Sequence, residues 1–307
     1  MIPMSKKPTL ATSVTSRDPK GLKATTIFTD AYDGLKLDDD RAQRLNESVE
    51  FSAGLKQLMI ECSTPDRFKD EETNSNYVYP KEYKGPRPII EQIAAIANVF
   101  DIDPTQALVY AKNLPELPER AEGWFAVPSL AALAKKHFPE VADPAEQYCR
   151  AVQLVHTKIS DSRSFYNYRE GGIIPTQLRL HTRTAQAFAQ IAETQPGDIL
   201  IIAAQLGLCH RGRSVQRARE VFMANEYGLG SLITGSIILT HPERLVRSEE
   251  LDMDCSGDEF APSAAGDWTR CPDFHFGDDQ VRFDASRVYG ALQDFGSVSG
   301  FLGSVAT

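Results

Sequence analysis

The sequence predicts a mixed fold of the α/β or α+β class, in which a mainly helical part precedes a part that contains a sheet. Apolar residues recur at helical spacing through much of the first half of the chain. The second half holds two largely apolar runs, residues 199–204 and residues 232–239, that are typical of buried strands. Of the 307 residues, 42% are hydrophobic and 24% are charged, ordinary proportions for a chain that folds.

Composition divides the chain into three regions. Residues 1–34 are rich in Ser, Thr, Lys and Pro, which predicts a flexible arm without a packed core. Residues 35–165 are expected to form a mainly helical domain, and residues 166–307 an α/β domain. In the helical domain, Asp38 opens a predicted helix that runs to about Ile60, because acidic residues suit the positive end of a helix dipole.

Residues 88–113 predict a pair of helices. Pro88 suits the first turn of a helix to Phe100, and Asp103 is placed to cap a second helix that ends near Ala111. The pair fits either a DNA-binding helix-turn-helix or a plain helical hairpin. The second helix is short and carries few polar residues that could contact a groove, which favours the plain hairpin. Ser129 and Asp143 are expected to cap two further helices.

A βαβ unit is predicted in the second half. Residues 199–204 form its first strand, Ser214 caps a helix that runs to about Tyr227, and residues 232–239 form its second strand. The two strands are expected to be adjacent and parallel, with a right-handed connection. Later, residues 274–276 and 281–283 predict a β-hairpin.

Charge and cysteine content limit the partners and the cellular compartment that we expect for this protein. The net charge is −9 and the pI is about 5.3, which argues against a broad basic surface for nucleic acid or anionic lipid, although a local basic site fits within these totals. No run approaches the roughly 20 apolar residues that span a bilayer, and no apolar core follows the first residues as in a secretory signal. Five scattered cysteines without a CxxC pair indicate reduced thiols. We therefore expect a cytoplasmic protein without a membrane partner.

The motif that most suggests a binding site lies after the first predicted strand. It includes an arginine pair at a helix start, where free N–H groups and the positive dipole end favour an anion. Cationic side chains there are unfavourable unless something negative is present. The sequence thus predicts a site for a phosphate or carboxylate, formed by His210, Arg211, Arg213, Ser214 and Arg217. The alternative is that the protein's own carboxylates pair with these arginines. The glycine spacing excludes a P-loop or a dinucleotide fingerprint.

Four carboxylates within eight residues form a second candidate site. Asp252, Asp254, Asp258 and Glu259 surround a glycine, and the first positions match the opening of a calcium loop. The match fails where a bidentate glutamate should close the loop, because Ser263 stands there. A Mg²⁺ site is less demanding, since it needs one or two carboxylates and a ligand's phosphates. The favoured interpretation is an exposed acidic turn, or a set of carboxylates that pair with the arginines above, because the ligand spacing is incomplete. If the segment binds a cofactor, Mg²⁺ or Ca²⁺ is the expected one.

A third segment joins aromatic residues to an arginine and glycines. Tyr166, Tyr168 and Arg169 precede Gly171 and Gly172. Such residues can stack on a base or another flat ligand, but they more often anchor a loop to the core, and that interpretation is favoured. Several histidines could supply an acid–base group, although no catalytic triad is evident from their order: His181, His210, His241 and His275.

Several segments together resemble a family of uncharacterised bacterial proteins found mostly in genomes of very small uncultivated bacteria. They are residues 121–126, 165–171, 197–200, 210–215, 240–245 and 254–260, and the resemblance spans about Tyr77 to Leu302. It implies a bacterial, cytoplasmic setting and transfers no functional residues.

The function that best fits these patterns is binding of a phosphate-bearing small ligand or nucleotide. If a metal and the arginines act together, phosphoryl transfer or phosphoester hydrolysis is the natural chemistry, because both neutralise developing phosphate charge. Two alternatives stay open: a non-enzymatic DNA- or protein-binding regulator, and a structural protein that assembles with copies of itself.

Overall fold

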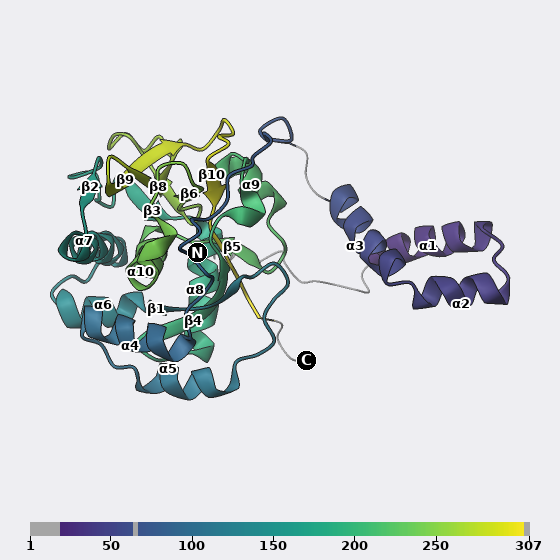
Figure 1. Ribbon diagram of the computed structural model, residues 1–307, viewed down its shortest axis with the longest axis horizontal. Coiled ribbons are helices and arrows are strands. Elements are labelled where there is room, and N and C mark those ends of the chain that lie inside the picture. The colour runs from purple at the N-terminus through teal and green to yellow at the C-terminus, as the bar shows by residue number, and fades with distance from the viewer. Residues whose placement is uncertain (1–18, 64–66, 304–307) are drawn as a thin grey trace, which may run out of the picture. The chain divides into compact units, whose positions relative to one another are not determined.

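The computed structural model describes residues 19–63 and 67–303, and the contacts within the chain divide it into two units, Met1–Pro65 and Asp66–Thr307. The predicted mixed α/β class is confirmed, with helices in the N-terminal unit and both helices and sheets in the second (Figure 1). Residues 1–18 of the expected arm lie outside the described residues. Each unit is described by itself.

The first unit consists of three helices. Asp38 caps the second helix by accepting a hydrogen bond from the Arg41 N–H at 2.9 Å. The single helix expected over residues 38–60 is broken at Ser48, where a new helix begins. None of residues 22–60 is buried, so the described part of this unit has no packed core. Its helices are α1 (Pro19–Gly34), α2 (Asp39–Glu47) and α3 (Val49–Ser63).

The second unit contains a four-stranded sheet in which every neighbouring pair is antiparallel. Its order is β1-β4-β11-β5, and all seven residues of β4, a central strand, are buried. The strand β1 lies within the region expected to be mainly helical, so this sheet joins that region to the next. The strands are β1 (Gly123–Pro128), β4 (Ile199–Gln205), β5 (Glu226–Gly228) and β11 (Ser299–Phe301).

The second sheet has seven strands and includes the predicted hairpin. Strands β8 and β9 pair over their full lengths, which confirms that prediction. Asp278 and Asp279 form the turn with φ of 47° and 58°, the left-handed backbone that a tight hairpin turn requires. The strands are β2 (Phe165–Asn167), β3 (Leu178–Leu180), β6 (Asp252–Asp254), β7 (Asp258–Phe260), β8 (Arg270–Gly277), β9 (Gln280–Arg287) and β10 (Phe295–Ser297).

The prediction of a βαβ unit was wrong. Residues 232–239, the expected second strand, lie in helix α10 (Ser231–Thr240), and both partners of β4 are antiparallel to it. All residues of α10 except Leu239 are buried, because the helix lies between the two sheets (Figure 1). A helix surrounded by protein can be apolar on every side, so this run lacks the amphipathic pattern of a surface helix.

Other helices cover the sheets, and most begin where expected. Ser129 and Asp143 cap α6 and α7 by accepting N–H hydrogen bonds. The helix after Ser214 ends at Val221 rather than near Tyr227, because β5 begins at Glu226. The α-helices are α4 (Ile89–Phe100), α5 (Thr105–Tyr110), α6 (Leu130–His137), α7 (Pro144–Ser162), α8 (Thr182–Thr194) and α9 (Val215–Val221); the 3-10 helices are η1 (Ala111–Asn113), η2 (Leu208–His210) and η3 (Pro242–Arg244).

Candidate functional site

The predicted anion-binding residues lie between β4 and α9, except for Arg217, which lies in the first turn of α9. Gly207 has a φ of 121°, which lets the chain turn sharply after the strand. Ser214 caps α9, and its Oγ accepts a hydrogen bond from the Arg217 N–H at 3.1 Å. The segment therefore presents arginines around the start of a helix that is only seven residues long.

Two glutamates of the preceding connector occupy this helix start. The Glu71 carboxylate accepts hydrogen bonds from Ser214 Oγ at 2.5 Å and from Gln216 Nε2 at 2.6 Å. Glu72 lies 2.5 Å from Arg217 Nε and 3.3 Å from Arg213 Nε. Burial opposes ionisation of Glu72, but the hydrogen bond and charge of these arginines outweigh it and lower its pKa. An internal anion thus fills the place expected for a ligand.

The remaining two residues of the predicted set also have internal partners. Arg211 donates to the carbonyl oxygen of Tyr77 at 2.9 Å. His210 is fully buried, and its Nε2 lies 2.7 Å from Glu226, which is fully buried too. Arg213 Nη1 lies 3.2 Å from His210 Nδ1, so Nδ1 is the acceptor and Nε2 carries the proton that Glu226 receives in a hydrogen bond. The cluster is a closed network of charges and hydrogen bonds.

The four predicted metal ligands fall into separate environments. Asp258 accepts hydrogen bonds from Ser231 N–H at 2.7 Å and from Tyr148 Oη at 2.6 Å, at the start of α10. Glu259 pairs with the half-exposed Arg179 at 2.8 Å. Burial raises the pKa of Asp258 to about 6, although the hydrogen bonds from Ser231 and Tyr148 oppose the shift. Asp258 and Glu259 are therefore held by protein groups.

Asp252 and Asp254 lie together on β6. Burial, together with the charges of Asp273 and Asp294, raises the pKa of Asp252 to about 9. Burial and the charge of Asp273 raise the pKa of Asp254 well above its ordinary value. Among the described residues, no group of three or more His, Cys, Asp or Glu side chains is placed to hold a metal ion.

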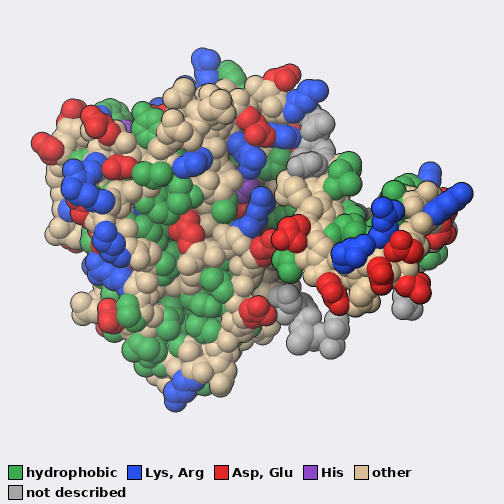
Figure 2. All heavy atoms as spheres, turned by 45° about the vertical axis from the view of Figure 1, so that its right-hand side comes forward, with side chains coloured by type: hydrophobic (Ala, Val, Ile, Leu, Met, Phe, Trp, Pro, Cys, Tyr) green, Lys and Arg blue, Asp and Glu red, His purple; other side chains and the backbone are tan. Residues whose placement is uncertain are grey.

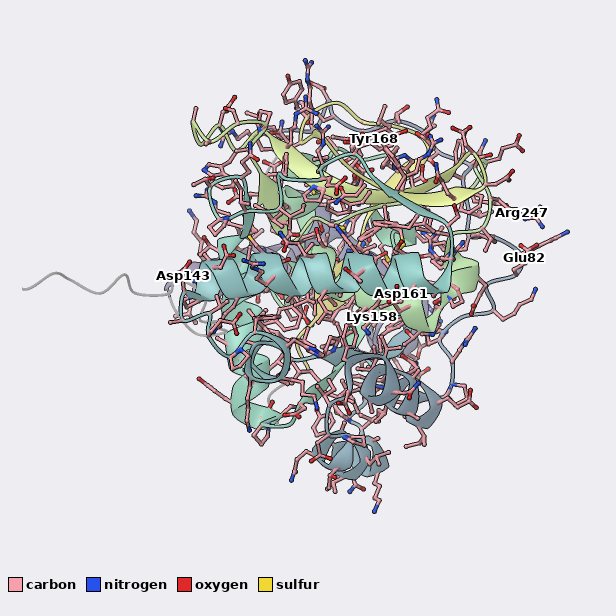
Figure 3. The ribbon with its side chains drawn as sticks, turned by 90° about the vertical axis from the view of Figure 1, so that its left-hand side faces the viewer. Glu82, Asp143, Lys158, Asp161, Tyr168 and Arg247 are labelled. Atoms are coloured by element: carbon pink, nitrogen blue, oxygen red, sulfur yellow. The ribbon has the colours of Figure 1, made fainter. Side chains whose placement is uncertain are left out.

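A concave site of about 540 Å³ lies elsewhere, between α7, β2 and the loop that follows β2. In Figure 3, α7 crosses this side of the unit with Asp143 near its beginning and Asp161 near its end. The lining combines polar, carboxylate and aromatic side chains, and we call it the His156 pocket. It is lined by Gln153, His156, Thr157, Ser160, Asp161, Phe165, Tyr166, Asn167, Glu170, Gly171 and Ile173.

The hydrogen bonds of Asn167 fix the tautomer of His156. Asn167 Oδ1 accepts from the Arg169 N–H at 2.7 Å, so its Nδ2 is the group that faces His156 Nδ1 at 3.4 Å. An amide nitrogen only donates, hence Nδ1 accepts and the ring proton lies on Nε2. Within the described residues, His156 Nε2 has no hydrogen-bond partner. A residue that lines the pocket therefore has a buried N–H donor without an acceptor.

His156 is held in an apolar environment that keeps it neutral. The residue is 6% exposed, and its ring lies 4.3 Å from the Phe283 ring and 5.2 Å from the Phe165 ring, measured between centroids. Burial lowers the pKa of His156 to about 3. At neutral pH the side chain is thus an uncharged hydrogen-bond donor rather than a cation.

The sequence interpretation missed His156 and noticed only part of its surroundings. The aromatic segment after α7 supplies Tyr166 to the pocket, whereas Arg169 pairs with Asp284 at 2.6 Å and anchors the loop. A histidine among the apolar positions of α7, next to Val152, Val155 and Ile159, was the available signal. Such a residue shows in sequence as a polar interruption of an apolar helix face.

The other histidines considered as acid–base candidates have partners within the protein. His181 caps α8, and His275 Nδ1 lies 2.9 Å from Asp273. His241 is buried like His156, but its Nε2 accepts from the Arg87 N–H at 3.0 Å and its Nδ1 lies 2.8 Å from Thr240 Oγ1. His156 therefore differs from His241 in leaving one ring nitrogen unpaired.

Comparison with known proteins adds no assignment: no protein family, curated protein or solved structure matches this chain. Within the described part of the chain, no helix has the length and apolar character needed to cross a membrane. Figure 2 shows basic and acidic side chains intermingled on the face that it draws.

Proposed function

We propose that this protein binds a small, flat, nitrogen-containing ligand of the nucleobase or nucleoside type in the His156 pocket. The observation that carries the proposal is a neutral, buried histidine that lines a cavity of about 540 Å³ and whose Nε2–H has no partner among the described residues. A buried donor without a partner costs about 1–3 kcal/mol, and a ligand acceptor would remove that cost.

The rest of the lining supports a ligand with donors as well as an acceptor. Asp161 and Glu170 are exposed carboxylates at the pocket, and the lining contains no Lys or Arg. Carboxylates accept hydrogen bonds from amino and ring N–H groups and repel a phosphate. Tyr166 is 50% exposed and offers a ring face for stacking. A heterocycle that carries both an acceptor and N–H donors matches these groups, whereas an anion does not.

Ligand-observed NMR on the full chain with adenosine, guanosine, cytidine and uridine tests the proposal. At least one nucleoside should bind, and its 5′-monophosphate should bind more weakly because of the two carboxylates. His156→Phe keeps an aromatic ring among aromatic neighbours and removes the donor, so it should weaken binding at least tenfold, equivalent to about 1.4 kcal/mol. Lys158→Ala, on α7 but outside the lining, is the control and should bind like wild type.

The proposal fails if none of the four nucleosides binds, or if His156→Phe binds them as wild type does. Circular dichroism and thermal melting of both variants establish that any loss of binding is not a loss of fold.

Binding of a phosphate-bearing ligand at the start of α9 is a second candidate function. The observation that favours it is that this donor set already accepts anions, the carboxylates of Glu71 and Glu72. A phosphate there would have to displace the connector. Nucleoside monophosphates that bind more tightly than their nucleosides, and lose this preference in Arg213→Ala, would support this candidate over the His156 pocket.

A further inference from the structure

A row of oxygen-bearing side chains crosses the second sheet on the face opposite His156. Asp254 on β6 is in register with Asp273 on β8 and with Ser297 on β10. Residues in register on neighbouring strands point to the same face of a sheet, so these three side chains are adjacent. Their chain neighbours Met253 and Phe274 point the other way, into the core.

These side chains are buried, and two of them have an oxygen without a partner. Asp273 and Ser297 are fully buried and Asp254 is 5% exposed. Within the described residues, neither Asp273 Oδ2 nor Ser297 Oγ has a hydrogen-bond partner. Two adjacent carboxylates in such a place repel each other and lose their hydration, which is unfavourable unless a positive charge compensates them.

The cationic groups nearby compensate these carboxyls only in part, although the charge of Arg219 lowers the pKa of Asp254 against the effect of burial. Arg219 reaches the same region from α9, but its guanidinium donates to the carbonyl oxygens of Ser256 and Asp258, at 2.9 and 2.5 Å. His275 Nδ1 lies 2.9 Å from one Asp273 oxygen, which leaves the second oxygen unpaired. Asp273 therefore keeps one oxygen without a partner beside the buried Asp254 carboxyl.

We propose that Asp254, Asp273 and Ser297 bind a divalent cation of the Mg²⁺, Ca²⁺ or Mn²⁺ class. Two carboxylates and a hydroxyl are hard oxygen ligands, and Mg²⁺ typically uses one or two carboxylates with waters in the remaining positions. The site lies across the sheet from the His156 pocket, so it does not depend on the proposed function. Of the metal ligands predicted from sequence, it retains Asp254 and adds two residues from other strands.

Binding of Mn²⁺ to chelator-treated full-length protein, followed by electron paramagnetic resonance at pH 7.5, tests this proposal. Wild type should bind about one Mn²⁺, with Mg²⁺ or Ca²⁺ competing for the same site. Asp254→Asn and Asp273→Asn should each weaken binding at least tenfold. Glu259→Gln is the matched control, because it removes a carboxylate that pairs with the half-exposed Arg179 outside the proposed site. It should bind Mn²⁺ as wild type does.

Ser297→Ala serves if the aspartate variants do not fold, because it removes a ligand without changing charge. It should weaken Mn²⁺ binding several-fold. The proposal is overturned if wild type binds no Mn²⁺, or if Asp254→Asn or Ser297→Ala binds it unchanged. If wild type binds no Mn²⁺, the melting temperatures of the Asn variants become informative. Asn variants that melt at or above the wild-type temperature would then show that the two carboxyls share a proton or an ordered water instead.

Discussion

The region around α9 and the His156 pocket both contain clustered polar residues, yet their hydrogen bonding differs. Around α9, Arg213 and Arg217 pair with Glu72, and His210 pairs with Glu226. In the pocket, His156 leaves Nε2–H unpaired, and the carboxylates of Asp161 and Glu170 are exposed at the rim. The polar groups around α9 are thus paired within the protein, whereas the pocket has a histidine donor without a partner among the described residues.

The difference matters because a satisfied network and an unsatisfied group respond differently to substitution. Removing a member of a closed network leaves its partners uncompensated, so the free energy of unfolding falls. Removing an unpaired buried donor costs little stability and changes binding instead. The predictions below use this contrast.

The largest effect is expected in the pH dependence contributed by His156. Its pKa of about 3 in the folded protein lies below the ordinary value of 6.5, so between these values the unfolded chain binds a proton that the folded protein does not. Stability is therefore lost as pH falls from 6.5 towards 3, by about 1.4 kcal/mol per pH unit at most. Relative to wild type, His156→Phe should gain stability over this window, by about 4–5 kcal/mol at its lower end.

Urea unfolding of both proteins between pH 7 and pH 4 measures this difference. A constant offset between wild type and His156→Phe across that range would contradict a buried neutral His156.

Arg217→Ala should give the next largest effect. Arg217 is buried and pairs with Glu72 and with Glu220. Its loss removes an arginine from both carboxylates, although Glu72 keeps Arg213 and Glu220 keeps two backbone N–H donors. We expect the free energy of unfolding to fall by about 2–4 kcal/mol, less than for a fully buried pair because Glu72 is partly exposed. Arg179→Ala, which breaks the more exposed pair with Glu259, is the comparison and should cost under about 1 kcal/mol. Equal losses in the two variants would argue against a closed network at α9.

Arg213→Ala should have a smaller effect of about 1 kcal/mol. Its ion pair with Glu72 is longer, at 3.3 Å, and both side chains are partly exposed. Because Glu71 and Glu72 occupy the helix start, sulfate or phosphate should not raise the wild-type melting temperature. A rise that disappears in Arg213→Ala would instead assign an anion site to this region.

The smallest effect on stability is expected for Tyr166→Ala. Tyr166 is half-exposed and packs edge-on against Tyr168, with 4.7 Å between ring centroids. Unfolding free energy should change by under about 0.5 kcal/mol, as for most surface substitutions. Nucleoside affinity should still fall about fivefold to tenfold through lost stacking. Tyr168→Ala, outside the pocket lining, is the matched control, and equal affinities in the two variants would contradict the stacking role.

Local signals predicted much of the fold because they act over a few residues. Ser129, Asp143 and Ser214 each cap the helix that follows them, and the hairpin turn lies at Asp278 and Asp279 as the sequence indicated. Residues 199–204 form a buried strand because their apolar run is bounded by turn residues. These features need no knowledge of distant contacts.

The helix α10 could not be predicted from such signals. Its sequence is apolar on all sides and rich in Ile and Thr, which suits a strand as well as a buried helix. The helix is buried between two sheets, and at Gly235 an added Cβ would lie 2.5 Å from Val155 Cγ1. That close approach is a tertiary contact, so it cannot be inferred from the run itself.

The candidate sites were harder to predict than the fold. The arginines around Ser214 were located correctly, but the carboxylates that pair with them come from residues 71 and 72, more than 140 residues away in sequence. His156 was overlooked because an unpaired nitrogen is a property of the folded environment. Asp273 and Ser297 join Asp254 only through strand register.

The most direct test of the account is the state of the His156 ring, measured by long-range ¹H–¹⁵N NMR of the full chain. We expect the neutral tautomer with its proton on Nε2, unchanged from pH 8 to pH 5, and a shift of the Nε2 resonance when a nucleoside binds. A proton on Nδ1, or a ring that becomes charged near pH 6, would contradict the buried unpaired donor on which the proposed function rests.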